Sequence, residues 1–515
     1  MGSFIIYLTS SIGCLFVFRF LIRFLMKVWW TPIRIQSMLR SQGIDGPSYK
    51  FIHGNSKEIA KMEHNASSNP IELSHHLLFP TVLPHTYQWT KLYGKNFLSW
   101  HGPQARFVTT ESNLIKEIFN NRDGIFPKRE PDVYVRKLLG YGLVTATAEN
   151  WFKQRKISNQ AFHAESLKGM IPGMIASVET MLERWENEGS KEIDVYKEFK
   201  ILTSEIISRT AFGSSYLEGQ HIFDMLMRFA VIISKNKYEV RIPGIRNLVK
   251  TQDDIESKRL EQGVRKSFIN MIKKREEAAM MDQSANRYGT DFLGLMLKAH
   301  HEADKAKNLS LDDLIDECKT FYVAGHETTA SLLTWIILLL AMHQDWQDKA
   351  RDEILEIFGR KTPFPDGLTR LKIVSMIINE TLRLYPPAIL LDRKIERKVT
   401  LGKLILPADI IVEVPILAIH HNPEIWGEDA HQFKPERFAE GVAKATNNNA
   451  AAFLTFGLGA RNCVGSSFTV TETKIALSMI LQRYSFSLSP SYVHSPFVLL
   501  TLSPKHGLPI IIQKL

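Results

Sequence analysis

The chain has 515 residues, of which 44% are hydrophobic and 23% charged, and this ordinary globular composition excludes disordered, collagen-like and disulfide-scaffold proteins. The net charge is +10, and five of the basic residues but only one acid lie in residues 1–45. The rest is mildly basic without a clustered basic stripe, so we expect no nucleic-acid partner. Three cysteines, Cys14, Cys318 and Cys463, make no disulfide framework and fit a reducing compartment.

The N-terminal segment is apolar from Phe4 to Met26, interrupted by Arg19 and Arg23. A helix of about 23 residues is long enough to cross ~30 Å of hydrocarbon. Because the basic residues follow the apolar run, an uncleaved anchor over residues 1–27 is favoured over a cleaved signal peptide or a buried core helix. Residues 28–50, broken by glycine and proline at 43–47, are predicted to be a basic hinge.

The remaining residues, 51–515, show no internal repeat and no dividing linker, so we predict one large domain. Residues 97–100 and 106–109 are typical of two strands joined by a turn, and a helix is expected from Ser112. Helical periodicity dominates from about 150 to 385, and short strands and turns follow. The predicted fold class is therefore mainly α with small β-sheets.

The longest predicted helix begins after Ser310, which forms a capping-box-like pair with Asp313, and runs to about Ala341 without a proline. Two apolar patches, at 229–233 and 242–245, precede it. They are consistent either with ordinary core or with an additional membrane-touching surface, and the sequence leaves both interpretations open.

The most informative segment is the loop Phe456-Gly457-Leu458-Gly459-Ala460-Arg461-Asn462-Cys463-Val464-Gly465, which precedes a predicted helix. Its glycines permit tight turns and close approach to a flat group. A thiolate at a helix N-terminus is stabilised by backbone N–H groups, so we expect a lowered pKa for Cys463. The alternative is a buried structural cysteine in a glycine-rich turn.

This loop resembles the haem-binding signature of the cytochrome P-450 superfamily, with Phe456, Gly459, Arg461, Cys463 and Gly465 at the fixed positions. The resemblance implies the cytochrome P-450 fold, behind an N-terminal transmembrane helix, and haem b with Cys463 as its axial thiolate ligand. It also implies that Phe456 and Arg461 belong to the cofactor-binding set.

Further motifs support the resemblance. Glu380 and Arg383 share one helix face and, with Arg437, resemble the buried Glu–Arg–Arg cluster of the family. Family precedent assigns haem propionate binding to three further residues: Trp151, Arg155 and Arg393.

A second site-forming segment is Ala324-Gly325-His326-Glu327-Thr328-Thr329, midway along the long helix. Helical spacing places Ala324, Gly325 and Thr328 on one face, where glycine permits approach of a flat ring and Thr328 can hold a water. The segment resembles the oxygen-activation motif of the family, which implies that Thr328 and Glu327 are the catalytic proton-handling pair. His326 is expected to pack or hydrogen-bond.

The resemblance implies a monooxygenase that hydroxylates a lipophilic small molecule with O2. Glycine-rich dinucleotide-binding patterns are absent from the sequence, so electrons are expected from a separate NADPH–cytochrome reductase, at the endoplasmic reticulum membrane. Several segments, including Phe126-Pro127-Lys128, resemble the plant 72 clan, whose members oxidise isoprenoids, hormones and fatty acids. Family position assigns the wall of the substrate pocket to Phe321, Ala324, Ala388, Ile389, Leu390, Leu391 and Phe497. Two other classes remain open: a haem-thiolate isomerase or lyase acting on a peroxide, and a non-catalytic haem-binding protein.

Overall fold

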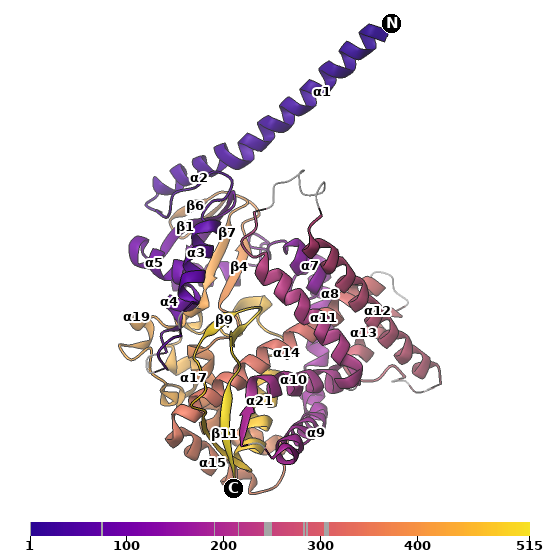
Figure 1. The fold of residues 1–515 in the computed structure, drawn as a ribbon, viewed down its shortest axis with the longest axis vertical. Coiled ribbons are helices and arrows are strands. Elements are labelled where there is room, and N and C mark those ends of the chain that lie inside the picture. Colours follow the sequence, from indigo (N-terminus) through magenta and orange to yellow (C-terminus); the bar gives the residue numbers. More distant parts are fainter. Residues whose placement is uncertain are drawn as a thin grey trace.

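The fold is mainly helical with small β-sheets, as predicted, and was obtained as a computed structural model (Figure 1). It describes residues 2–68, 70–73, 76–189, 191–214, 216–240, 250–281, 284, 287–302 and 308–515. The helices, including one π-helical (η1) and three 3-10 segments (η4–η6), are α1 (Gly2–Leu25), η1 (Met26–Trp30), α2 (Thr31–Arg40), α3 (Ser56–Ala66), α4 (Leu78–Val82), α5 (Pro84–Tyr93), α6 (Ser112–Asn120), α7 (Val133–Leu139), α8 (Ala148–Ala161), α9 (Ala164–Glu188), α10 (Val195–Phe212), α11 (Tyr216–Lys235), α12 (Gln252–Met281), α13 (Phe292–His300), α14 (Leu311–Met342), α15 (Gln344–Phe358), α16 (Pro365–Arg370), α17 (Ile373–Leu384), α18 (Ile416–His420), α19 (Pro423–Trp426), η4 (Pro435–Phe438), α20 (Gly441–Ala445), η5 (Ala450–Ala452), η6 (Gly459–Arg461) and α21 (Ser466–Leu481). The strands are β1 (Asn96–His101), β2 (Gln104–Thr109), β3 (Glu192–Asp194), β4 (Leu390–Lys394), β5 (Val399–Leu401), β6 (Leu404–Leu406), β7 (Ile411–Pro415), β8 (Tyr484–Leu488), β9 (Pro496–Val498), β10 (Leu502–Pro504) and β11 (Pro509–Lys514).

The N-terminal helix α1 projects away from the body of the molecule (Figure 1). Together with η1 and α2 it forms a helical stretch, Tyr7–Arg40, that is long and apolar enough to cross a membrane, and the tested window of this stretch has none of its residues buried. A second helix, α14, passes the same test of length and composition but has 78% of its window buried. The first is therefore suited to an anchor, whereas α14 is a core helix of the body.

The segment expected to be a hinge, residues 28–50, is not an irregular connection. The helix continues through η1 and α2 as far as Arg40, and Leu39 and Ile44 are buried in a cluster that includes Trp100 of β1. The hydroxyl of Tyr49 donates to the Val28 carbonyl. These contacts tie the base of the anchor to the body, and the irregular part is limited to the residues after α2.

A four-stranded sheet lies beneath this junction, with the strand order β1-β2-β7-β4. The hairpin β1–β2 confirms the predicted strand–turn–strand, and β2 pairs with β7 in parallel. In the antiparallel pair β4–β7, Asp392 lies opposite Glu413 and Arg393 lies opposite Val412. Residues 125–127 run alongside β4, because the Lys394 N–H donates to the Pro127 carbonyl at 2.9 Å. This arrangement brings Lys128 close to β4.

The helix α14 crosses the centre of the molecule and packs against α10 and α17 (Figure 1). Its predicted start is confirmed, because Ser310 and Asp313 form a complete capping box. Of the two apolar patches, Phe229 and Ala230 in α11 are fully buried while Val231 is 56% exposed, which indicates core for the first patch. The second patch, at 242–245, lies outside the described residues.

The predicted cluster around Glu380 is present and joins α17 to the segment containing η4. Arg383 donates two hydrogen bonds of 2.7 Å to the Glu380 carboxylate, and both side chains are fully buried. Arg437 Nε lies 3.5 Å from the same carboxylate, and Arg383 also donates to the carbonyls of His420 and Ala430. The cluster therefore holds α17 against the loop that leads to Cys463.

Candidate active site

A cavity opens beside Cys463, and we refer to it as the Cys463 cavity. One wall comes from α14, through Phe321, Ala324, Gly325 and Thr328. The other parts are the cysteine loop, α8 and the residue after it, α10, the start of α21, and the loops before α7 and α8. They contribute Lys128, Leu143, Val144, Trp151, Arg155, Phe162, Ile207, Arg461, Asn462, Val464, Gly465, Phe468 and Thr469. Residues separated by more than 300 positions in the sequence thus converge on one space.

The cysteine loop takes its shape from two glycines in left-handed conformation, Gly457 at φ 76° and Gly459 at φ 74°. A Cβ atom at Gly459 would lie 2.1 Å from the Phe119 carbonyl oxygen, so no other residue fits the close approach of this loop to α6. The Cys463 N–H donates to the Phe456 carbonyl at 2.8 Å, which closes the turn. The helix α21 begins three residues after Cys463, at Ser466.

The sulfur of Cys463 is reachable from the cavity, although protein atoms surround the residue on its other sides. Burial raises the pKa of the Cys463 thiol, while the backbone N–H of Gly465 and the charge of Arg155 act in the opposite direction. The lowered pKa predicted from the helix terminus is therefore wrong for the protein alone, because desolvation outweighs the two stabilising groups. A metal cation bound to the sulfur would deprotonate the thiol directly.

Three guanidinium groups predicted to bind a cofactor lie around this loop. Arg461 donates to the Ala146 carbonyl at 2.8 Å and stacks 4.5 Å above the Trp151 ring. Arg155 donates to Asn462, through its backbone and side-chain oxygens. Arg393 does not line the Cys463 cavity, but its positive charge lowers the pKa of Arg461, which burial and Arg393 together bring to about 10.

Half-buried cations therefore line the Cys463 cavity, and the buried Arg393 lies close to Arg461 behind them. Arg393 is 5% exposed, and its described hydrogen bond goes to the backbone carbonyl of Asp392. Burial lowers the pKa of Arg393 to about 10 and that of Lys128 to about 8. Lys128 was not predicted as a site residue. Its segment, Phe126-Pro127-Lys128, indicated a resemblance to a plant branch of the family but no function for the lysine. This cation-rich lining fits a group that carries two carboxylates, since each buried charge needs a partner.

On the α14 wall, Ala324 and Thr328 face the cavity as predicted, whereas Gly325 also packs against another helix. Thr328 Oγ1 donates to the Ala324 carbonyl at 2.6 Å, and both residues face the cavity. The backbone of Gly325 also lines the cavity, but a Cβ atom there would lie 2.8 Å from Ile207 Cδ1. Gly325 thus packs closely against Ile207 of α10 as well as lining the cavity, and a larger residue would have to displace the Ile207 side chain.

Glu327 does not face the Cys463 cavity with Thr328. Its carboxylate is buried and lies 3.5 Å from the Lys200 ammonium and 3.3 Å from His326 Nε2. Burial acts to raise the pKa of Glu327, but the contacts with His326 and Lys200 outweigh it and lower the pKa. His326 Nδ1 lies 3.0 Å from Thr203 Oγ1, which agrees with its expected hydrogen-bonding role. Lys200 is partly exposed, so this chain of polar groups leads from Glu327 toward solvent.

Phe456 contributes its carbonyl to the cysteine turn, and its ring packs against the hydrophobic core instead of lining the cavity. Among the predicted substrate-pocket residues, Phe321 and Ala324 line the Cys463 cavity, whereas Leu390 lines a separate cavity described below.

A cysteine loop, a small-residue helix wall with a threonine, and buried cations around one cavity define the architecture of a haem-thiolate enzyme. Residues 75–508 match the family model for cytochrome P450. The chain belongs to the cytochrome P450 family, whose members hold haem b through an axial cysteine thiolate, and it is a P450 monooxygenase.

Similar proteins come from plants. Cytochrome P450 CYP749A22 of Panax ginseng is 54% identical, covering 99% of this chain and 97% of the relative. The 11-oxo-beta-amyrin 30-oxidase of Glycyrrhiza uralensis is 43% identical (95% and 94% covered), and echinocystic acid 23-monooxygenase of Saponaria officinalis is 39% identical (99% of both). Relatives named as oxidases and monooxygenases support oxygen insertion over the isomerase, lyase and non-catalytic alternatives.

Proposed function

We propose that Cys463 is the axial ligand of haem b and that Arg155, Arg393, Arg461 and Trp151 bind its propionates. The observation that carries this assignment is the convergence of the Cys463 sulfur, the α14 wall and the buried cations on one cavity. Lys128 joins the propionate-binding set because it lines the same cavity, and its ammonium would be shared between a propionate and Asp392, which lies 3.8 Å away. Gly325 and Phe456 support the cofactor through backbone placement rather than through side-chain contact.

A haem held by these residues supplies the binding and reductive activation of O2 and the transfer of one oxygen atom to a C–H bond. Thr328 Oγ1 faces the same space and holds or passes a proton there, once its hydrogen bond to Ala324 is exchanged for one to water. Glu327 supplies protons from the other side of α14, through its contacts with His326 and Lys200. Apolar side chains such as Phe321 and Val144 exclude bulk water from the cavity.

The proposed substrate is a lipophilic terpenoid, steroid-like hormone or fatty acid, and a terpenoid is favoured because two relatives carry triterpenoids in their names. Electrons are proposed to come from a separate NADPH–cytochrome reductase. We place the protein in the endoplasmic reticulum membrane with a single span, α1, and the catalytic domain in the cytosol. The apolar, exposed stretch Tyr7–Arg40 supports the span, and the basic residues that follow the apolar run support the cytosolic side for the domain.

The proposal is tested by co-expressing the full chain with a plant NADPH–cytochrome reductase and incubating the microsomes with triterpenoids, diterpenoid hormones, steroids and fatty acids. We expect a hydroxylated product, with the substrate mass increased by one oxygen atom, only when reductase and NADPH are both present. Product that forms equally well without reductase, or from a hydroperoxide alone, would contradict the monooxygenase assignment for this site.

Replacing Thr328 with alanine is expected to divert most reducing equivalents from hydroxylated product to hydrogen peroxide, because the hydroxyl that holds the proton is lost. The measurement is product and peroxide formed per NADPH consumed. Thr334→Ala is the matched control, since Thr334 makes the same kind of hydrogen bond to a carbonyl of its own helix, at 2.7 Å to Ala330, but does not line the Cys463 cavity. An unchanged ratio in Thr328→Ala would remove Thr328 from the proton path.

Replacing Glu327 with glutamine is expected to slow product formation by about a hundred- to ten-thousandfold, the range for loss of one proton-transfer group. The haem spectrum should stay normal, because Glu327 lies outside the Cys463 cavity. The kinetic solvent isotope effect should rise, since proton delivery becomes rate-limiting. Lys200→Met should give a smaller effect in the same direction. Turnover and isotope effect equal to those of the unmodified enzyme would show that protons arrive by another route.

A further inference from the structure

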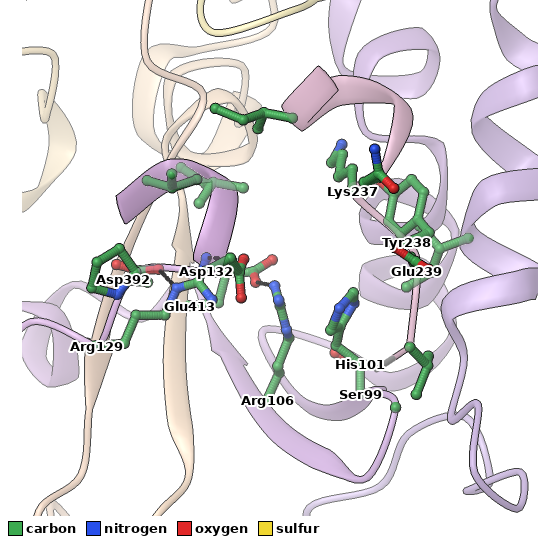
Figure 2. A pocket seen from close by; sticks show the side chains of 18 of the residues that line it. Ser99, His101, Arg106, Arg129, Asp132, Lys237, Tyr238, Glu239, Asp392 and Glu413 are labelled. Atoms are coloured by element: carbon green, nitrogen blue, oxygen red, sulfur yellow. Dashed lines mark hydrogen bonds and ion pairs between the residues drawn. The ribbon is translucent and has the colours of Figure 1, made fainter. Parts of the chain in front are cut away.

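A second cavity, of about 650 Å³, lies between the β1–β2 hairpin, α7 and the end of α11, and we call it the Arg106 pocket (Figure 2). Its volume is in the range of binding sites for small organic molecules. It has one strongly polar wall and one apolar wall. The apolar wall includes Ile59, Leu83, Trp89, Val108 and Leu390.

The polar wall is organised around two carboxylates, Asp392 of β4 and Glu413 of β7, which face each other across the sheet. Like charges in this position repel, so each requires a cation. Arg106 Nη1 donates to Glu413 at 2.6 Å, and Arg129 Nε donates to Asp392 at 2.6 Å. Figure 2 shows these groups on one side of the pocket, with Arg106 in the middle.

The opposite side of the pocket carries His101 and the segment with Lys237, Tyr238 and Glu239 (Figure 2). Burial lowers the pKa of His101 to about 4, so at neutral pH the ring is uncharged. His101 Nδ1 lies 3.3 Å from Ser56 Oγ, which leaves Nε2 as the nitrogen available to a ligand. Lys237 pairs with Glu63, at 3.1 Å. The Lys237 charge on this side is therefore also paired.

A pocket whose cations are already paired with carboxylates differs from an anion-binding site, where the cations are free to bind the ligand. A carboxylate or phosphate ligand would compete with Glu413 and Asp392 for the two guanidinium groups. An uncharged hydroxyl does not, because each guanidinium has five N–H donors and each carboxylate about four acceptor positions, so paired ions can still bind hydroxyl groups. Several charged donors and acceptors around one apolar-backed space favour a neutral group that carries several hydroxyls.

The Arg106 pocket adjoins the Cys463 cavity through Asp392. The Asp392 carboxylate contacts Arg129, which lines the Arg106 pocket, and lies 3.8 Å from Lys128, which lines the Cys463 cavity. Lys128 and Arg129, which are consecutive in one loop, therefore face the Cys463 cavity and the Arg106 pocket, respectively. The two cavities therefore meet at one ion-paired wall, and a molecule in the Arg106 pocket lies next to the catalytic cavity.

We propose that the Arg106 pocket binds an uncharged polyhydroxylated group, such as a sugar, carried by the lipophilic substrate. This inference rests on the proposed function and narrows its substrate class to amphipathic molecules, with the hydroxyl groups at Arg106, Arg129 and His101. The lipophilic skeleton lies along the apolar wall and extends toward the Cys463 cavity.

The test compares three ligands that share one skeleton: echinocystic acid, its 3-O-glucoside and its 3-O-glucuronide. Binding to the full-length holoenzyme in lipid nanodiscs is measured by isothermal titration calorimetry, and turnover is measured separately. We expect the glucoside to bind at least about tenfold more tightly than the aglycone, as one or more retained hydrogen bonds to charged groups would give. The glucuronide should gain nothing over the glucoside.

The variant Arg106→Lys keeps the ion pair with Glu413 but removes the planar set of donors. It should weaken glucoside binding by about tenfold and leave aglycone binding unchanged. Ser99→Val, on the pocket wall, is a second variant that leaves every ion pair intact, and it should give a smaller selective loss. Arg184→Lys is the matched control, because Arg184 pairs with Glu198 outside the pocket.

Equal affinity for glucoside and aglycone would overturn the proposal, and so would equal losses for both ligands in Arg106→Lys. Markedly tighter binding of the glucuronide would show an anion site instead. Failure of the sugar site can be distinguished from failure of the proposed function. Aglycone that is hydroxylated without glucoside preference removes only the sugar site, whereas absence of turnover for every lipid tested removes the proposed function.

Discussion

Substitution of Cys463 by alanine is expected to abolish the thiolate-type spectrum of the reduced, carbon monoxide-bound protein, together with all hydroxylation activity. The reason is that the Cys463 sulfur faces the cavity formed by the cysteine loop and α14, and no other described cysteine lines it. The measurement is the carbon monoxide difference spectrum of equal amounts of folded protein. Haem content should fall as well.

The controls are the two other cysteines, replaced one at a time. Cys14→Ser changes an exposed residue of the anchor helix. Cys318→Ala removes a buried thiol of α14, and burial raises the pKa of that thiol. Both proteins should keep the thiolate spectrum. A normal spectrum in Cys463→Ala would refute the ligand assignment, and an imidazole-type spectrum in the unmodified protein would do the same.

Breaking the Glu380 cluster should give the second large effect. In Glu380→Gln the guanidinium of Arg383 stays fully buried, loses one of its two carboxylate acceptors to an amide NH2 donor, and loses the compensating negative charge. Removing one partner of a buried ion pair costs about 3–5 kcal/mol, because an unpaired charge remains inside the protein. We expect the free energy of unfolding to fall by this amount and haem to be lost, although neither residue lines the Cys463 cavity.

Stability is measured by denaturant unfolding, followed by the haem absorbance and by far-ultraviolet circular dichroism. The matched control is Glu186→Gln, which breaks the exposed pair between Glu186 and Lys514 and should leave unfolding unchanged. Unfolding of Glu380→Gln that coincides with that of the unmodified protein would show that the cluster does not stabilise the haem domain.

Local patterns predicted most of the elements that carry the site. The hairpin at residues 96–109 and the Ser310–Asp313 cap depend on near neighbours, and both are present. The cysteine loop was recognisable for the same reason, since Gly459 must adopt a conformation and an approach to α6 that other residues cannot. Each of these features depends on a short stretch of chain and on backbone geometry.

Other features could not be predicted because they depend on partners distant in the sequence. Glu327 and Thr328 are adjacent, yet helical geometry turns their side chains apart, and only the position of Lys200 on α10 explains the contacts of Glu327. The raised pKa of Cys463 follows from burial by several elements at once. The Arg106 pocket requires β2, β4, β7 and the 129–136 loop together.

The sequence by itself determined the chemistry of the protein: an apolar N-terminal helix, a helical body and a cysteine loop of the haem-thiolate type, since these follow from short-range order and residue type. Only the tertiary structure decided which charges face one another, because Asp392 and Glu413 become neighbours through strand pairing. Whether two ionisable groups attract, repel or bind a ligand depends on distance and burial, and the folded chain sets both.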